Sequence, residues 1–349
     1  MLADIAVEFM FESLVFDTDR AEALVRTLQD ELSGPRLARW VRRIDIRFHD
    51  PYLICQTIAR LHLPNLQVQC VFASFLEPLP IISSHHPLHT IVVDYSLLPS
   101  LPSSHPDVFQ RLRALTIIIK RVGQQEQLPI DDLVCPNLSQ LTIIAVSSAA
   151  VPVIDCISAI GSTSHPNLTR LTFHFYTQRG EHIQPLVSWI ARIRVQLQHL
   201  TITETNSTSV SLAAADLRDI LSLCPNLTEL VVSAIKGIDS ANAPSYAHKK
   251  LQTLGLPLEY SNETNRSAYS RMISTFSQKD AFPMMETIRI TRMEEEFTCE
   301  GLVGNIEVAG WLRPHAICLL ETGIALEDGH GEDIRQVLKG DMHFQHLEA

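Results

Sequence analysis

The chain is short of positive charge, and this shortage limits what it can bind. Lysine and arginine number 28 against 39 aspartate and glutamate residues, so the formal net charge is -11 at neutral pH. A protein that neutralises nucleic-acid phosphates needs a surplus of lysine and arginine on one face. The sequence therefore predicts no nucleic-acid partner.

Cysteine pairs are missing too. The seven cysteines form no CxxC pair and no short, evenly spaced framework; they stand at positions 55, 70, 135, 156, 224, 299 and 318. Closely spaced pairs are typical of zinc sites and of small disulfide-bonded domains. We therefore expect reduced thiols in a cytoplasmic or nuclear protein.

Motifs of the common enzyme classes are also absent. The chain has no GxSxG, no GxxxxGK[ST], no HExxH, and no GxGxxG after a strand pattern. These motifs mark serine hydrolases, P-loop proteins, zinc proteases and dinucleotide-binding enzymes. We expect a non-enzymatic protein with no catalytic residue, no cofactor and no metal site.

Only one hydrophobic run approaches the length of a membrane span. Residues 141–161 contain a single charge, Asp155, and are interrupted by Pro152. An ionisable residue inside a bilayer is costly, and residues 141–146 already have the spacing of a strand. The apolar N-terminus has no basic residue before Arg20, whereas a signal peptide needs a basic leading region. We expect no membrane partner.

One short sequence motif, which we call the phrase, recurs along the chain. CPNLSQLTIIAV begins at Cys135, HPNLTRLTFHFY at His165 and CPNLTELVVSAI at Cys224. Its apolar residues are spaced as LxxLxL, which puts the second and third on one face of a short strand. Nine such triplets occur: Val41/Ile44/Ile46, Leu88/Ile91/Val93, Leu112/Leu115/Ile117, Leu138/Leu141/Ile143, Leu168/Leu171/Phe173, Leu197/Leu200/Ile202, Leu227/Leu230/Val232, Leu251/Leu254/Leu256 and Met285/Ile288/Ile290. A tenth copy begins at Leu66 but has Gln69 in its second apolar position.

The spacing of these copies indicates the fold class. Steps between copies run from 22 to 34 residues and average about 27, inside the range of leucine-rich repeats. Helical spacing intervenes at 17–32, 185–197, 211–225 and 266–278. We predict an α/β leucine-rich-repeat solenoid, horseshoe-like, with parallel strands on the concave face and helices outside. No strand and helix pair buries its apolar face alone, so the phrase recurs.

This pattern also divides the chain. We expect an N-terminal capping helix region at 1–34, the irregular solenoid at 35–295, and a C-terminal cap or partly ordered tail at 296–349. The proline and asparagine before each strand mark the turn from helix to strand. The asparagine or cysteine usual three residues after the last strand leucine is missing; those positions hold Val146, Tyr176, Thr205 and Ile235.

Several phrases resemble the fungal proteins that join an F-box to a long, irregular leucine-rich-repeat domain. They are FMFESLVF followed by a helix and ARWVRRIDI, the CPNLTEL repeats, and ETGIALEDGHGEDI near the C-terminus. The resemblance implies that the repeats capture a substrate, which an F-box tethers to a cullin-based ubiquitin ligase. Only residues 1–8 precede FMFESLVF, so we expect the repeat domain alone, with the F-box absent. A ligase adaptor is then a partner only if an upstream F-box exists.

The strand positions that face away from the core are the candidate partner-binding residues. The charged and polar ones we single out are Arg43, Arg47, Gln140, Arg170, His174, His199, Glu229 and Arg289. A column of threonines on the same face (Thr116, Thr142, Thr172, Thr201) is explained by strand propensity and cross-strand pairing. The arginines of segment 36–47 either dock an acidic partner or form a solvated edge of the cap.

Two polar clusters have ordinary structural explanations. His85, His86 and His89 are separated by Pro87, which prevents a helix from aligning them, and no further ligand is near in sequence, so we expect no metal there. The glycines of EDGHGEDI, from Glu327, favour an exposed turn. Two functions remain open: a substrate-recognition module of the F-box type, and a free-standing protein-binding scaffold with no link to a ubiquitin ligase.

Overall fold

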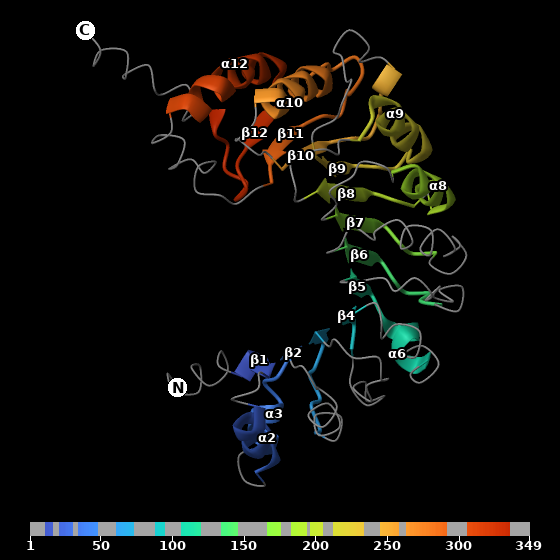
Figure 1. The fold of residues 1–349 in the computed structure, drawn as a ribbon, viewed down its shortest axis with the longest axis vertical. Coiled ribbons are helices and arrows are strands. Elements are labelled where there is room, and N and C mark those ends of the chain that lie inside the picture. The colour runs from blue at the N-terminus through green and yellow to red at the C-terminus, as the bar shows by residue number, and fades with distance from the viewer. Residues whose placement is uncertain are drawn as a thin grey trace, which may run out of the picture. The chain divides into compact units, whose positions relative to one another are not determined.

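The computed structural model describes most of the repeats. The described residues are 11–16, 21–30, 34–47, 61–72, 88–94, 106–119, 134–145, 166–175, 183–193, 196–204, 212–233, 245–257, 263–291 and 306–335. The chain divides into two compact units, Met1–Thr169 and Arg170–Ala349, and each unit alternates strands with helices (Figure 1).

In the first unit, every described strand is parallel to its neighbour and the strands follow chain order. The strands are β1 (Ser13–Phe16), β2 (Arg43–Arg47), β3 (Val68–Phe72), β4 (Thr90–Asp94), β5 (Ala114–Ile119) and β6 (Gln140–Ala145). The helices between them are α2 (Ala21–Gln29), α3 (Gly34–Ala38) and α6 (Pro106–Arg111). Parallel order requires a crossover after each strand, and α2, α3 and α6 are the helices described within these crossovers.

The second unit repeats this plan with longer helices. Its parallel strands are β7 (Arg170–Phe175), β8 (His199–Glu204), β9 (Glu229–Val232), β10 (Thr253–Leu256), β11 (Thr287–Ile290) and β12 (Ala325–Glu327). Its helices are α8 (Ile183–Ile193), α9 (Ala214–Leu223), α10 (Glu263–Phe276) and α12 (Ile306–Thr322). All four helices lie on one side of the strands, which leaves the other strand face without a helix of this unit (Figure 1).

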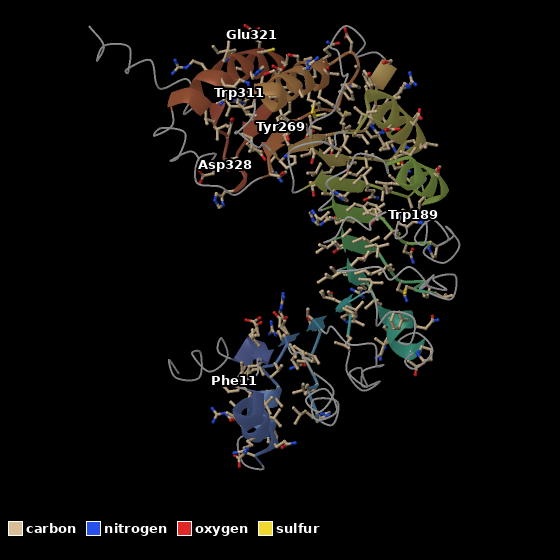
Figure 2. The ribbon with its side chains drawn as sticks, in the orientation of Figure 1. Phe11, Trp189, Tyr269, Trp311, Glu321 and Asp328 are labelled. Atoms are coloured by element: carbon tan, nitrogen blue, oxygen red, sulfur yellow. The ribbon has the colours of Figure 1, made fainter. Side chains whose placement is uncertain are left out.

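The predicted triplets form the core. All nine are buried, with exposed fractions of 6% or less, and Leu66 of the tenth copy is buried as well. In the second unit, Phe173 meets Trp189 of α8 edge to face, with ring centroids 5.8 Å apart; Trp189 is labelled in Figure 2. Aromatic pairs at this distance add to the area that they bury. The α/β solenoid of parallel strands is therefore confirmed.

The repeated phrase builds the turn before each strand. The Leu138 N–H donates to the Cys135 carbonyl (3.0 Å), and the equivalent bond joins Leu227 to Cys224. Both thiols are buried, and burial raises the pKa of each to about 12. A thiol in this state packs as a small hydrophobe and does not react as a thiolate.

The asparagine and the hydroxyl of the phrase bind the preceding repeat. The Asn137 Nδ2 donates to the Gln110 carbonyl (2.6 Å), and the Asn65 Nδ2 donates in the same way to the Arg39 carbonyl (2.6 Å). The Ser139 hydroxyl donates to the carbonyl of Arg113, which also accepts the backbone N–H of Ser139. We call these the asparagine and hydroxyl positions of the repeat. They satisfy backbone groups that would otherwise be unpaired at the turn.

The structure contains a strand at each end that the triplets did not predict. The first, β1, lies within the segment expected to be a capping helix region, although Phe11, Leu14 and Phe16 have the triplet spacing. The last, β12, has Leu326 opposite Ile288 but a glycine and an aspartate where the other two apolar residues would stand. The tenth copy also forms a strand, β3, despite Gln69.

The turn predicted at EDGHGEDI is present, but the expectation that it is exposed is wrong for Asp328. This side chain is fully buried beside β12 (Figure 2). Its Oδ1 accepts the backbone N–H groups of His330 and Glu332, both at 2.9 Å. Gly331 has a φ of 85°, which a glycine adopts without strain. The carboxylate therefore closes the turn from the inside.

Candidate functional site

The strand face of the second unit, opposite its helices, carries polar residues in register. Its first row aligns the residues that begin the strands: Arg170, His199, Glu229, Thr253, Thr287 and Ala325. Cross-strand neighbours in such a row are close enough for their side chains to interact. Three of the predicted partner-binding residues are therefore consecutive in one row.

Two of them bind each other. The His199 Nδ1 lies 2.7 Å from the Glu229 Oε2, and their side chains are 28% and 33% exposed. A carboxylate accepts, so the imidazole proton stands on Nδ1 in this pair. The pair fixes both side chains on a strand surface while leaving a third of each open to a partner.

The next row holds a second charged pair. The Arg289 Nε and Nη2 donate to the Glu327 Oε2 at 2.8 and 2.6 Å. Glu327 was not among the predicted residues, because β12 lacks the apolar triplet that reveals the other strands. Its position opposite Arg289 in the register is the signal that identifies it.

His174 lies further along β7 and is only partly available. Its Nδ1 is 2.5 Å from the Thr203 Oγ1, and that hydroxyl donates onward to the Phe173 carbonyl. The ring N–H therefore donates to the threonine oxygen. Burial lowers the pKa of His174 below its ordinary value, so the neutral ring is favoured.

The threonine column has the role expected from strand chemistry. Thr116 aligns with Thr142 in the first unit, and Thr172 aligns with Thr201 in the second. All four are half-buried on the strand faces. Paired threonines at adjacent strand positions support the sheet and do not by themselves indicate a ligand.

In the first unit the predicted residues are spread out. The Arg43 Nε donates to the Asp45 Oδ1 at 2.9 Å, and Asp45 is buried although it lies on the face away from the core. Gln140 is exposed at the start of β6. Arg47 aligns with Phe72 in the register, and its side chain lies outside the described residues.

The arginines of segment 36–47 have separate contacts. Arg42 pairs with Glu12 at 3.4 Å, and Arg39 stacks over the Trp40 ring at 5.5 Å. Together with the Arg43–Asp45 pair, this means that three neighbouring arginines have three different partners. Docking of an acidic segment on all of them at once remains a prediction.

The remaining classes of site are not seen where the structure is described. No group of three or more histidine, cysteine, aspartate or glutamate side chains in these ranges could hold a metal ion. His89 precedes β4, while His85 and His86 lie outside the described residues. No helix among the described segments is long and apolar enough to cross a membrane.

Parallel strands in chain order, nine of the twelve described ones carrying a buried apolar triplet, define a leucine-rich-repeat solenoid. Among solved structures the chain is similar to the leucine-rich-repeat-containing protein LegL7 from Legionella pneumophila, with 14% identity over 97% of this chain and 91% of that one, and a TM-score of 0.45. No protein-family model and no curated protein matches it. The class assignment rests on the strand register and on the buried triplets.

Proposed function

We propose that the chain is a non-enzymatic protein-interaction module, and that its partner binds the strand face of the second unit. The observation that carries this proposal is the pair of charged contacts across neighbouring strands, His199–Glu229 and Arg289–Glu327. Each holds two ionisable side chains in one geometry on a rigid element. Preordered side chains lower the entropy that binding costs.

The partial exposure of these pairs also supports the strand face of the second unit as the binding surface. Arg289 is 40% exposed and Glu327 18%, so a partner can reach the arginine without first breaking its pair. Arg170, exposed at the start of β7, adds a positive charge in the row that contains His199 and Glu229. A partner surface with both signs of charge fits this face, and charge complementarity favours specificity over affinity.

We further propose that this module is the substrate-recognition half of an F-box ubiquitin-ligase receptor, working in the cytoplasm or nucleus. FMFESLVF, CPNLTEL and ETGIALEDGHGEDI support this proposal as a resemblance. The alternative is a free-standing scaffold without a ligase. In both cases the proposed partner is a protein.

The surface is tested by affinity purification of the tagged chain and of variants with reversed charge. Arg170→Glu and Glu229→Lys alter the first row, and both should lose a partner that the unaltered chain retains. The control is Arg218→Glu, because Arg218 is 55% exposed on α9, on the helix side of the unit. A partner that binds all three variants equally would place the binding surface elsewhere.

The ligase link has its own test. The chain and a version extended by the upstream reading frame are each co-purified with the adaptor subunit that F-box proteins bind. Retention by the extended version supports the receptor proposal. If neither version retains the adaptor, while the charge variants still lose their partner, the free-standing scaffold is the function.

A further inference from the structure

A cavity of about 500 Å³ lies in the first unit, at the ends where β4, β5 and β6 begin. Six described residues line it: His89, Arg111, Arg113, Asn137, Ser139 and Asn167. Its volume is in the range of small-molecule sites, which run from about 300 to 1,000 Å³. None of these residues belongs to the strand face of the second unit, so a ligand in this cavity is independent of the proposed function.

The cavity lies where the repeat of β5 departs from the repeated phrase. The asparagine position is filled by Asn65, Asn137 and Asn167, and each donates its Nδ2 to a backbone carbonyl of the preceding repeat. Ser139 and Thr169 fill the hydroxyl position, and each donates to a carbonyl in the same way. In the repeat of β5, arginine stands at both positions, as Arg111 and Arg113.

The bond described for Arg111 differs from those that the phrase makes elsewhere. The Arg111 Nε donates to the Asp107 carbonyl within α6, at 3.2 Å. Arg113 is exposed, and no hydrogen bond or ion pair joins its guanidinium to another described residue. The repeat therefore replaces two short neutral groups that bind backbone with two long cations beside a cavity.

The charge of the lining is opposite to that of the chain. The described lining contains two arginines and a histidine and no carboxylate, although the chain carries -11 overall. The His89 Nδ1 is buried, and no described residue bonds it. A buried polar atom without a partner is rare in folded proteins and calls for a ligand or water.

We propose that this cavity binds a phosphate monoester. Guanidinium groups donate two parallel hydrogen bonds to phosphate, and a phosphate monoester carries close to two negative charges at neutral pH. Arg111 and Arg113 supply the positive charge, and a ring proton on the His89 Nδ1 supplies a third donor. The Ser139 hydroxyl and one N–H of each of the Asn137 and Asn167 amides donate to backbone carbonyls and hold the wall in place.

The phosphate has two chemical sources: a phosphorylated side chain of a partner protein, or a free small phosphate ester. Both present the same terminal group to the arginines. Fluorescence anisotropy with a labelled peptide that contains one phosphoserine, with the unphosphorylated peptide as reference, measures the first source. Competition by free O-phosphoserine and by inorganic phosphate measures the second.

The decisive variant restores the phrase. Arg111→Asn combined with Arg113→Ser recreates the local pattern of Asn137, Leu138 and Ser139, so the chain has a structural reason to fold. We expect the affinity for the phosphopeptide to fall by about tenfold or more, because charge-assisted hydrogen bonds are lost. Thermal unfolding of this variant should occur at or above the temperature of the unaltered chain.

Two further variants sharpen the result. His89→Gln places glutamine where Gln67 and Gln198 stand in equivalent repeats, and it should weaken phosphopeptide binding without unfolding the unit. Arg218→Gln, on the second unit, removes one exposed cation and should leave binding unchanged.

The outcomes separate clearly. Phosphopeptide binding that is lost in the Arg111/Arg113 variant supports the site, and equal competition by free phosphoserine assigns it to small esters. The proposal is overturned if no phosphate compound binds, if the unphosphorylated peptide binds equally, or if the double variant binds as tightly as the unaltered chain. Tighter binding of a single-stranded oligonucleotide than of the phosphopeptide would overturn the assignment to a monoester.

Discussion

The strand faces of the two units differ, although their backbones follow one plan. In the first unit, the face away from the core includes, beside Arg43, Asp45 and Gln140, four half-buried aliphatic residues: Val68, Val92, Ile118 and Ile144. In the second unit, the corresponding rows contain Arg170, His199, Glu229, Arg289 and Glu327. Both units bury the same kind of triplet toward their helices. The repeat therefore determines the scaffold, while the alternate strand positions are free to specify different surfaces.

The largest loss of stability should come from a substitution on the buried core face, which is built in the same way in both units. Phe173→Ala removes a fully buried ring that packs against Trp189, and we expect the second unit to lose about 3–5 kcal/mol of unfolding free energy. Denaturant unfolding followed by tryptophan fluorescence measures it. Thr172→Ala, the neighbouring residue on the opposite face, is the control and should cost far less. Equal losses would contradict the division into a core face and a free face.

The next largest effect should come from the turn that ends the second unit. Asp328→Ala removes the buried carboxylate that accepts two backbone N–H groups, at a cost of about 1–3 kcal/mol. Asp328→Asn retains an acceptor oxygen and should cost less. Hydrogen exchange at residues 324–335 localises the change. Exchange there that does not respond to Asp328→Ala would show that the carboxylate is not what closes the turn.

Low pH should lower the stability of the second unit by protonating histidines whose pKa is lowered by burial. The His248 Nε2 donates to the Cys224 carbonyl, and its Nδ1 accepts the N–H of Lys250 and Leu251. Desolvation by burial lowers the pKa of His248; the bond to Cys224 opposes this shift and the charge of Lys250 reinforces it. Protonation of Nδ1 would break two backbone bonds.

The sign of the pH dependence follows from this lowered pKa. The unfolded chain takes up the proton first, so stability is full above the ordinary histidine value of 6.5 and is lost as the pH falls from there toward the lowered pKa. Burial lowers the pKa of His174 and His315, in the same unit, in the same direction. Hydrogen exchange near pH 7.5 and near pH 5 measures the effect around residues 245–256. His248→Gln should flatten it, and an unchanged pH profile in that variant would exclude His248 as the cause.

The smallest effect should come from the charged pairs of the second strand face. Arg289→Ala should lower stability by only about 0.2–1 kcal/mol, because exposed ion pairs contribute little. The same variant should weaken partner binding more than it weakens folding. Thermal unfolding and partner affinity, measured together, decide this. A loss of stability comparable to that of Phe173→Ala would make the pair structural and not a binding feature.

Several elements were predictable from the chain alone. The nine apolar triplets gave the core correctly, because strand alternation and burial are local properties of the spacing. The helical segments that became α2, α8, α9 and α10 were predicted from their periodicity. The turn at EDGHGEDI followed from its glycines. Periodic patterns of this kind report burial directly, so they identify the class of fold.

Other features needed the three-dimensional register. The Arg289–Glu327 pair joins residues 38 positions apart, and His199 and Glu229 are 30 apart. No spacing rule connects them, because the lengths of the intervening crossovers vary. The strand β12 escaped prediction because its inward positions include Gly323 and Asp328 in place of aliphatic residues.

By itself, the sequence determined that the chain is a parallel-strand solenoid with one buried strand face, since each repeat contains the residues that form its own strand and turn. Only the tertiary structure decided which polar side chains meet, that Asp328 is buried, and that Arg111 and Arg113 border a cavity. Those results depend on how each repeat stacks on the next, and stacking sets distances between residues that lie far apart in the chain.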